Sequence, residues 1–249
     1  MIYIRSQEEI EKMRESNRIV AETILVLGRE IKPGIQTRKL DKIADDYIHS
    51  RHAKSAFKGY RGYPASICIS IDEEVVHGIP SKRELLAGQI VSVDVGVEKD
   101  GYYGDAAYTF AVGEVSEVKA HLMQVTKDSL YKGIEKALPG KHLSDIGNAV
   151  QSYAEKNGFS VVRDMVGHGI GERLHESPEV PNYGEAGRGP VLRPGMCLAI
   201  EPMVNAGTFE VYALDDDWTV VTADHQPSAH YEHTIAITEN GPVILSVSE

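Results

Sequence analysis

Two histidines lie close together in a stretch that is rich in glycine. The stretch is MVGHGIGERLHE, Met165 to Glu176, and its histidines are His168 and His175. Glycine disfavours a helix by up to about 1 kcal/mol per residue, and glycines alternate here at Gly167, Gly169 and Gly171. We therefore expect a loop, in which glycine allows the backbone to approach a site closely and to adopt unusual dihedral angles.

Four acidic residues accompany apolar runs that are typical of buried strands: Asp94, Asp105, Glu201 and Glu232. The first two belong to VSVDVGVEKDGYYGDAAYTF, which predicts two strands joined by a tight turn at Asp100-Gly101. That register places Asp94 opposite Ala107, whereas a turn at Lys99-Asp100 would place it opposite Asp105. In both registers the two carboxylates point to the same face, at most about 7–8 Å apart.

Carboxylates this close in an apolar setting cannot all ionise unless a positive group joins them. A single strand carboxylate is usually exposed at the strand end or paired with a lysine, but the second matching pair argues against that explanation here. One imidazole and four carboxylates carry a formal charge of −4, which two divalent cations would neutralise. Oxygen-rich sites with one imidazole suit Mn, Fe, Co or Zn. Neither cysteine, Cys68 or Cys197, adjoins these motifs, which argues against a thiolate site.

The glycine-rich stretch does not meet the requirements of two other motifs that it partly matches. The run from Gly167 to Gly171 is GxGxG, one residue short of the dinucleotide-binding fingerprint, and no acidic residue follows at the required distance. The pair His175-Glu176 could begin an HExxH zinc motif. Pro178 would break the helix that this motif requires, and Glu179 stands where the second histidine belongs.

The elements that must position these residues occur twice. Ser6 and Glu9 form a capping box that begins a helix ending at Lys32-Pro33-Gly34, and a second helix follows. A helix from about Glu117 to Ala137 ends at Leu138-Pro139-Gly140, and another helix follows it. The apolar face of the second helix carries Leu40, Ile43, Ala44 and Tyr47, and the corresponding later positions are Ile146, Ala149, Val150 and Tyr153.

The strands repeat in the same order. LLAGQIVSVDVG (85–96) resembles VLRPGMCLAIEP (191–202), and in each an acid ends the apolar run, six residues after a glycine. A second acid, Asp105 or Glu232, begins the next strand. We therefore predict one α+β domain over residues 1–249, built from two pseudo-symmetric halves of about 1–113 and 114–249, with the acids at their junction.

The composition excludes several classes of protein. The chain has 249 residues, 42% of them hydrophobic, and a net charge of −11. This charge argues against DNA and anionic membranes as partners. No apolar run approaches the roughly 20 residues of a membrane span, and the first residues, MIYIRSQEEIEKM, do not resemble a signal peptide. Two cysteines without a CxxC motif favour a cytoplasmic protein without disulfides.

Together these motifs resemble type I methionine aminopeptidases, over about Ser6 to Ser246. The resemblance rests on VVHGIP (75–80), Asp94, Asp105, GHGIGERLHE, IEP (200–202) and YEHT (231–234). It implies the pita-bread fold, an internally duplicated α/β structure around two metal ions. Glu232 follows Glu201 by only 31 positions, which leaves no room for the helical insertion of type II enzymes and resembles the short bacterial form.

The resemblance also implies the roles of the site residues. The metal ligands would be Asp94, Asp105, His168, Glu201 and Glu232, with Asp105 and Glu232 bridging two divalent ions of Co, Mn, Fe, Zn or Ni. A hydroxide between the ions would attack the peptide carbonyl, since metal ions lower the pKa of bound water. Glu201 would transfer its proton. His77 and His175 would contact the substrate and the developing oxyanion.

The substrate pocket that the resemblance implies lies in SAFKGYRGYPASICIS (55–70) and near Trp218. Its residues would be Phe57, Tyr60, Tyr63, Cys68 and Trp218, and such an aromatic and sulfur-containing pocket suits a thioether. Core packing is the alternative explanation for each aromatic residue. Leu174 stands where bacterial enzymes often have Phe, which predicts a wider pocket. We expect the acidic run Asp215–Asp217 to be a solvated loop.

The activity implied is hydrolysis of the N-terminal methionine from peptides and nascent chains when the second residue is small. The ribosome is a candidate partner, and we expect a monomer. Two alternatives share the fold: a proline-specific peptidase of the aminopeptidase P or prolidase type, and an inactive relative that binds peptides or proteins. The former usually carries a large N-terminal domain, and the latter loses metal ligands.

Overall fold

A pair of helices precedes each of two groups of strands along the chain in the computed structural model, which describes residues 1–247. The helices are α1 (Gln7–Glu30), α2 (Thr37–Ser50), α3 (Glu117–Ile134) and α4 (Ser144–Lys156), with one 3-10 turn η1 (Tyr60–Gly62). The strands are β1 (Lys54–Ser55), β2 (Cys68–Ile71), β3 (Glu74–Val76), β4 (Ile90–Lys99), β5 (Tyr102–Ala111), β6 (Ser160–Val161), β7 (Gly167–Gly169), β8 (Glu176–Val180), β9 (Cys197–Ile200), β10 (Met203–Asn205), β11 (Val211–Ala213), β12 (Val220–Thr222), β13 (Ser228–His230), β14 (His233–Thr238) and β15 (Gly241–Ile244).

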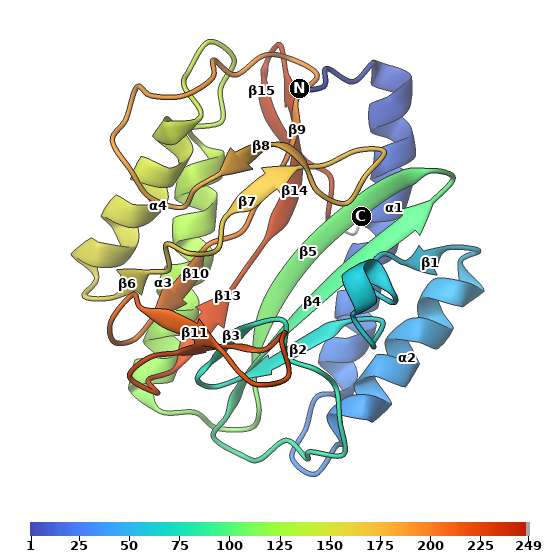
Figure 1. Ribbon diagram of the computed structural model, residues 1–249, viewed down its shortest axis with the longest axis vertical. Coiled ribbons are helices and arrows are strands. Elements are labelled where there is room, and N and C mark those ends of the chain that lie inside the picture. The colour runs from blue at the N-terminus through green and yellow to red at the C-terminus, as the bar shows by residue number, and fades with distance from the viewer. Residues whose placement is uncertain (248–249) are drawn as a thin grey trace.

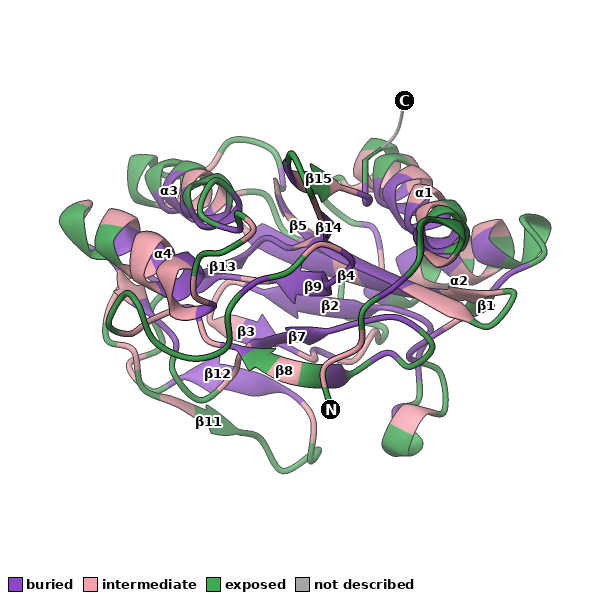
Figure 2. Cartoon of the chain, turned by 90° about the horizontal axis from the view of Figure 1, so that it is seen from above, coloured by how far each residue is buried: buried purple, intermediate pink, exposed green. Residues whose placement is uncertain are grey.

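The two helix pairs flank the strands. Figure 1 shows α1 and α2 at one side of the molecule and α3 and α4 at the other. Both pairs cover the same face of the strands, most of which are buried (Figure 2). One apolar cluster joins the first helix pair to β2 and β4, and a second joins the other pair to β9 and β14. The two largest parts of the core therefore lie one under each helix pair.

The predicted capping box of α1 is confirmed. The Ser6 hydroxyl accepts a hydrogen bond from the Glu9 N–H, and the Glu9 carboxylate accepts one from the Ser6 N–H. The helix ends at Glu30, shortly before Pro33 and Gly34, whose φ of 85° suits glycine. In the second helix pair, α3 ends at Ile134 rather than at Ala137 as expected. Residues 135–138 form tight turns instead, because the proline that follows disfavours helical geometry before it.

The β4–β5 hairpin settles the register of the first acid pair. Asp94 is the partner of Ala107, and Gly96 is the partner of Asp105. Asp100 and Gly101 both have positive φ, 52° and 81°, as a two-residue type I′ turn requires. The first of the two predicted registers is therefore correct. Asp94 lies in the middle of β4, and pairing with β5 continues to Lys99, as the predicted turn requires.

The second acid pair belongs to a five-stranded sheet of order β15-β14-β9-β7-β8. Glu201 directly follows β9, and Glu232 directly precedes β14. This sheet meets the hairpin where β5 and β14 run side by side: the Glu232 N–H donates to the Ala107 carbonyl, and the Thr234 hydroxyl donates to the Asp105 carbonyl. All four acids are therefore brought to one junction.

The mixed α/β fold class is confirmed, while the internal duplication and the division near residue 113 stay predictions. Within residues 1–247, no helix combines the length and the apolar character that crossing a membrane requires. Cys68 and Cys197 are free and buried, as expected for a chain without disulfides. Sheets β13-β10-β6 and β11-β12-β3 complete the strand layers around the junction.

Candidate metal centre

Five predicted side chains converge at the junction between the sheets. One atom from each of Asp105, His168 and Glu232 lies within 4.8 Å of the others, and all three residues are buried. Nε2 of His168 is 3.9 Å from Oδ2 of Asp105 and 3.6 Å from Oε1 of Glu201. Asp94 completes the set, since it shares a face of the hairpin with Asp105. Four strand regions that are distant in the sequence thus supply one cluster.

The carboxylate oxygens of this cluster lack partners. Among residues 1–247, Oδ1 of Asp94, Oδ1 of Asp105 and Oε1 of Glu232 are buried without any hydrogen bond. Buried polar atoms are almost always paired, and an unpaired one commonly marks an ion-binding site. Hard, unpaired oxygens beside one imidazole nitrogen are a donor set that fits divalent cations.

Burial dominates the electrostatics of the four acids. Burial raises the pKa of Asp94 to about 7. Burial also raises the pKa of Asp105 well above its usual range, and the charges of Glu232 and Asp94 add to it. The pKa values of Glu201 and Glu232 are raised well above their usual range, first by burial and then by neighbouring carboxylates. Neighbouring carboxylates thus add to the raised pKa of three of the four acids, but burial, rather than the expected mutual repulsion, is the larger cause. A cation bound among these acids would favour their charged forms.

His168 presents its free nitrogen to the acids. Its Nδ1 lies 2.9 Å from the carbonyl oxygen of Gly169, so Nδ1–H donates to that carbonyl. Nε2 then carries the lone pair, the usual arrangement for a histidine that ligates a metal. Burial lowers the pKa of His168 to about 4, which keeps the imidazole neutral at neutral pH.

The expected loop around His168 is a short strand. Residues Gly167–Gly169 form β7, which pairs with β9 and β8 at the centre of the sheet. None of Gly167, Gly169 and Gly171 has positive φ, so the expectation of unusual dihedral angles is wrong. The expectation of close approach is right: a Cβ at Gly167 would clash with the Ala199 carbonyl, and one at Gly169 with the Ser177 carbonyl. Glycine allows the neighbouring strands to approach on both sides of the histidine.

We expect Gly169→Ala to lower the free energy of unfolding by about 1–3 kcal/mol, because a methyl group forced against backbone has the cost of an overpacked core. Urea denaturation measures this change. The control is Gly101→Asn, since a Cβ at Gly101 meets no atom within 4 Å and Asn tolerates positive φ. Equal stability of Gly169→Ala and the unmodified chain would refute the steric role of this glycine.

His77 and His175 lie beside the cluster, in the wall of a cavity of about 280 Å³. The rings of His175 and His168 have centroids 4.3 Å apart, and the Tyr60 hydroxyl is 2.7 Å from Nδ1 of His175. Burial, followed by the charges of His168, Arg61 and His77, lowers the pKa of His175 to about 3. Burial also lowers the pKa of His77, whose backbone has a φ of 61°.

The same cavity brings all five predicted pocket residues together with Asp94 and Glu201. These residues are Phe57, Tyr60, Tyr63, Cys68 and Trp218. Tyr63 and Trp218 meet edge to face with centroids 5.0 Å apart, and the Tyr63 hydroxyl donates to the Gly78 carbonyl. Leu174 is buried in the apolar cluster behind Phe57, Tyr63 and Cys68 and does not line the cavity. Its effect on the width of the pocket stays a prediction.

Sequence reasoning missed several residues of the site. His230, on β13, is 1% exposed and places Nε2 3.8 Å from Oε2 of Glu201. It directly precedes the YEHT motif that contains Glu232, and this position is a signal that could have found it. Met165 and Met203 line the cavity, and each adjoins a motif that was recognised.

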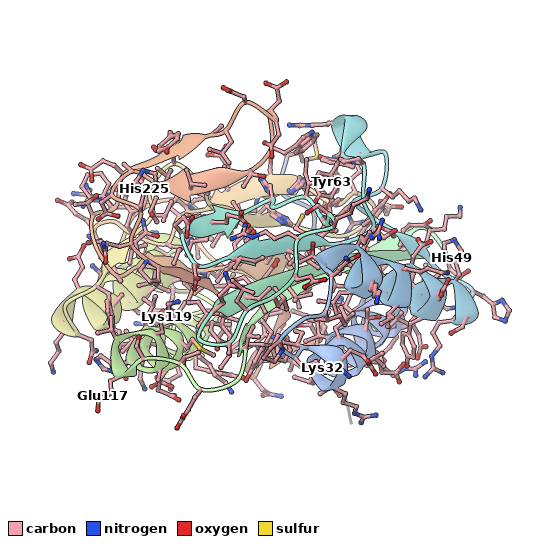
Figure 3. All side chains as sticks on the ribbon, turned by 90° about the horizontal axis from the view of Figure 1, so that it is seen from below. Lys32, His49, Tyr63, Glu117, Lys119 and His225 are labelled. Carbon is pink, nitrogen blue, oxygen red and sulfur yellow. The ribbon has the colours of Figure 1, made fainter. Side chains whose placement is uncertain are left out.

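Four histidines outside these motifs, His49, His52, His121 and His225, are exposed. Figure 3 shows His49 and His225 at opposite sides of the molecule. The run Asp215–Asp217 is exposed as expected, and Asp216 accepts hydrogen bonds from the backbone of Trp218 and Thr219.

The comparisons with known proteins agree with this geometry. The sequence profile of metallopeptidase family M24 matches residues 11–239. A methionine aminopeptidase from Clostridium acetobutylicum is 56% identical over 250 residues, which cover 100% of both chains. The crystal structure of methionine aminopeptidase from Thermotoga maritima has 46% identity and a TM-score of 0.98, with 100% of both chains covered. Prolidase from Pyrococcus furiosus shares the fold alone, with 22% identity and a TM-score of 0.78 over 99% of this chain and 66% of its own.

Proposed function

The chain belongs to metallopeptidase family M24, among the methionine aminopeptidases, and from this premise we propose how it removes the N-terminal methionine of peptides and nascent chains. The observation that carries the proposal is the position of the acid cluster. Asp94 and Glu201 reach both the cluster and the cavity lined by aromatic and sulfur groups. A substrate side chain in this cavity would therefore place the adjacent peptide bond beside the carboxylates.

Two divalent cations would be held by Asp94, Asp105, His168, Glu201 and Glu232. The three unpaired carboxylate oxygens and the free Nε2 of His168 support this ligand set. When bound, the cations would lower the pKa of water at the site and polarise the carbonyl oxygen of the scissile peptide bond. The metal that the enzyme uses is a matter for add-back experiments with Co, Mn, Fe, Zn and Ni.

Glu201 is the residue best placed to move a proton. It lies between the imidazoles of His168 and His230 and also reaches the cavity. We assign it the removal of a proton from the attacking water and the transfer of this proton to the leaving amine. The support for this assignment is its place between the cavity and the cluster, within reach of both a bound peptide and a water at the cluster.

His175 is placed to donate to the reacting carbonyl. If the Tyr60 hydroxyl donates to Nδ1 of His175, Nε2 of that ring carries a proton. A positioned N–H of this kind stabilises the negative charge that develops on the carbonyl oxygen. His77 stands in the same wall, edge-on to Trp218, where it would contact the substrate backbone.

The cavity favours methionine as the first residue and a small second residue. Aromatic rings and the Cys68 thiol provide the soft surface that a thioether prefers. The second side chain would lie between the imidazoles and the strand backbone that Gly167 and Gly169 bring close. Crowding at that point gives a steric reason for the preference.

One peptide panel tests both preferences. We expect Met-Ala-Ser to be cleaved at least about tenfold faster, in kcat/KM, than Leu-Ala-Ser or Met-Arg-Ser, since a lost pocket contact is worth about 1–3 kcal/mol. The released amino acid is measured after metal add-back. Equal cleavage of Met-Ala-Ser and Met-Arg-Ser would contradict the steric preference.

Cleavage of the peptide Ala-Pro-Ser distinguishes the proposed function from the two alternatives that share the fold. Faster cleavage of this peptide would indicate a proline-specific enzyme, although the likeness to prolidase shows the fold alone. An inactive adaptor would cleave nothing, but the convergence of the predicted ligands argues against that function. A cytoplasmic location, a monomeric state and contact with the ribosome stay predictions.

A further inference from the structure

We propose that His230 is a positioning residue, which donates a hydrogen bond from Nε2 to Oε2 of Glu201 and holds that carboxylate for proton transfer. The proposal rests on the proposed role of Glu201. It adds a residue that the predicted site did not contain.

The side chain of His230 is buried beside a single carboxylate. The residue is 1% exposed, and its Nε2 has no hydrogen-bond partner among residues 1–247. The carboxylate within 4 Å of this nitrogen is that of Glu201, whose Oε2 is 3.8 Å away. A buried imidazole N–H without a partner costs about 1–3 kcal/mol. The position of Glu201 offers the acceptor that would remove this cost.

The backbone around the pair is fixed on both sides. Met203 and His230 are partners in the β10–β13 ladder, and the Tyr231 N–H donates to the Pro202 carbonyl. The His230 N–H donates to Oγ1 of Thr109, which donates back to the His230 carbonyl. With the backbone fixed, side-chain rotation is what must close the gap from 3.8 Å to a hydrogen bond of about 2.9 Å.

The imidazole of His230 faces one oxygen of the Glu201 carboxylate, so the tautomer with its proton on Nε2 supplies the donor. Oε1 of Glu201 faces His168, and Oε2 faces His230. A donor on the second oxygen would stop the carboxylate from rotating and would keep the first oxygen directed at the cluster. Removal of a residue that hydrogen-bonds to a metal ligand commonly lowers metal affinity or activity by about 10–100-fold.

His230→Leu and His230→Gln separate positioning from packing. Leucine fills the space without a donor, whereas the glutamine amide can place an N–H near the position of Nε2. We expect His230→Leu to lower kcat for Met-Ala-Ser by about 10–100-fold and to weaken Co²⁺ binding to the metal-free protein by at least about tenfold. KM should change by less than about threefold, and His230→Gln should recover both losses to within about threefold of the unmodified chain.

Ser228→Ala is the matched control on the same strand. Ser228 is 2% exposed and donates to the Val204 carbonyl, so its variant also loses a buried hydrogen bond of β13. Thermal unfolding of all three variants accompanies kinetics and calorimetric titration with Co²⁺. We expect Ser228→Ala to lower the unfolding temperature while it keeps kcat and the affinity for Co²⁺.

Three results would overturn the proposal. The first is an unchanged kcat and Co²⁺ affinity in His230→Leu. The second is a glutamine variant that is as impaired as the leucine variant. The third is a loss of activity that follows the unfolding temperature across all variants, including Ser228→Ala. If the unmodified chain itself fails to cleave Met-Ala-Ser, the proposed function fails, and the Co²⁺ affinities still test the contact between His230 and Glu201.

Discussion

Removal of metal with excess chelator should abolish cleavage of Met-Ala-Ser, and Mn²⁺, Co²⁺ or Fe²⁺ should restore it. Metal-ion catalysis supplies several kcal/mol, so we expect a loss of at least about 10³-fold in kcat. The reason is the donor set: three buried carboxylate oxygens have no hydrogen-bond partner among residues 1–247, and Nε2 of His168 faces them. The measurement is turnover before chelation, after exhaustive dialysis and after stepwise addition of each ion.

The stability of the metal-free protein provides an independent measurement. Burial raises the pKa of Asp94 from the ordinary value for aspartic acid, about 4, to about 7. A carboxyl group whose pKa is raised in the folded state stabilises that state at low pH, and this stability is lost as the pH rises through the folded pKa. The metal-free protein should therefore become easier to unfold as the pH rises from about 4 through 7, and added cations should reverse this loss at pH 7.

Two results would contradict the metal dependence. One is full activity in excess chelator after dialysis. The other is an unfolding temperature that metal ions do not raise at pH 7. A suitable control ion is Na⁺ at matched ionic strength. Both ions screen the charges of the acidic chain, so Na⁺ shows how much of the stabilisation comes from screening alone.

The parts of the fold that local chemistry determines could be predicted from the sequence. The capping box at Ser6 and Glu9 begins α1 as expected, since both partners are three residues apart. The Asp100-Gly101 turn determines the register that places Asp94 opposite Ala107. Side-chain alternation then directs Asp94 and Asp105 to one face. These inferences depend on short-range geometry alone, so no tertiary information was needed.

Other parts depend on neighbours that the sequence does not reveal. The sequence around His168 predicts a loop because its glycines disfavour a helix, yet β9 and β8 pair with Gly167–Gly169 on both sides. His230 reads as an ordinary strand histidine until β10 places the Glu201 segment beside it. In both cases the deciding contact joins segments that are far apart in the chain. The resemblance to a known family supplied five converging side chains, but it gave no reason to examine His230.

His168→Ala and His175→Ala should have different effects, although the two rings are neighbours. His168 directs Nε2 at the acids, so its removal should weaken metal binding by more than the roughly 10–100-fold typical of residues that only support a ligand. His175 instead hydrogen-bonds to Tyr60 and lines the cavity. His175→Ala should leave the metal content unchanged and lower kcat by about 10²–10³-fold, the cost of losing one donor to a developing oxyanion.

The comparison decides between two interpretations of the glycine-rich stretch. If both histidines were ligands, both variants would lose metal to the same extent, and excess metal would rescue both. If the division of roles is correct, excess metal restores part of the activity of His168→Ala only, because His175→Ala already holds its metal. Metal content by elemental analysis and kcat at saturating metal measure the two effects separately. His49→Ala removes an exposed histidine of α2 that does not line the cavity and should change neither quantity.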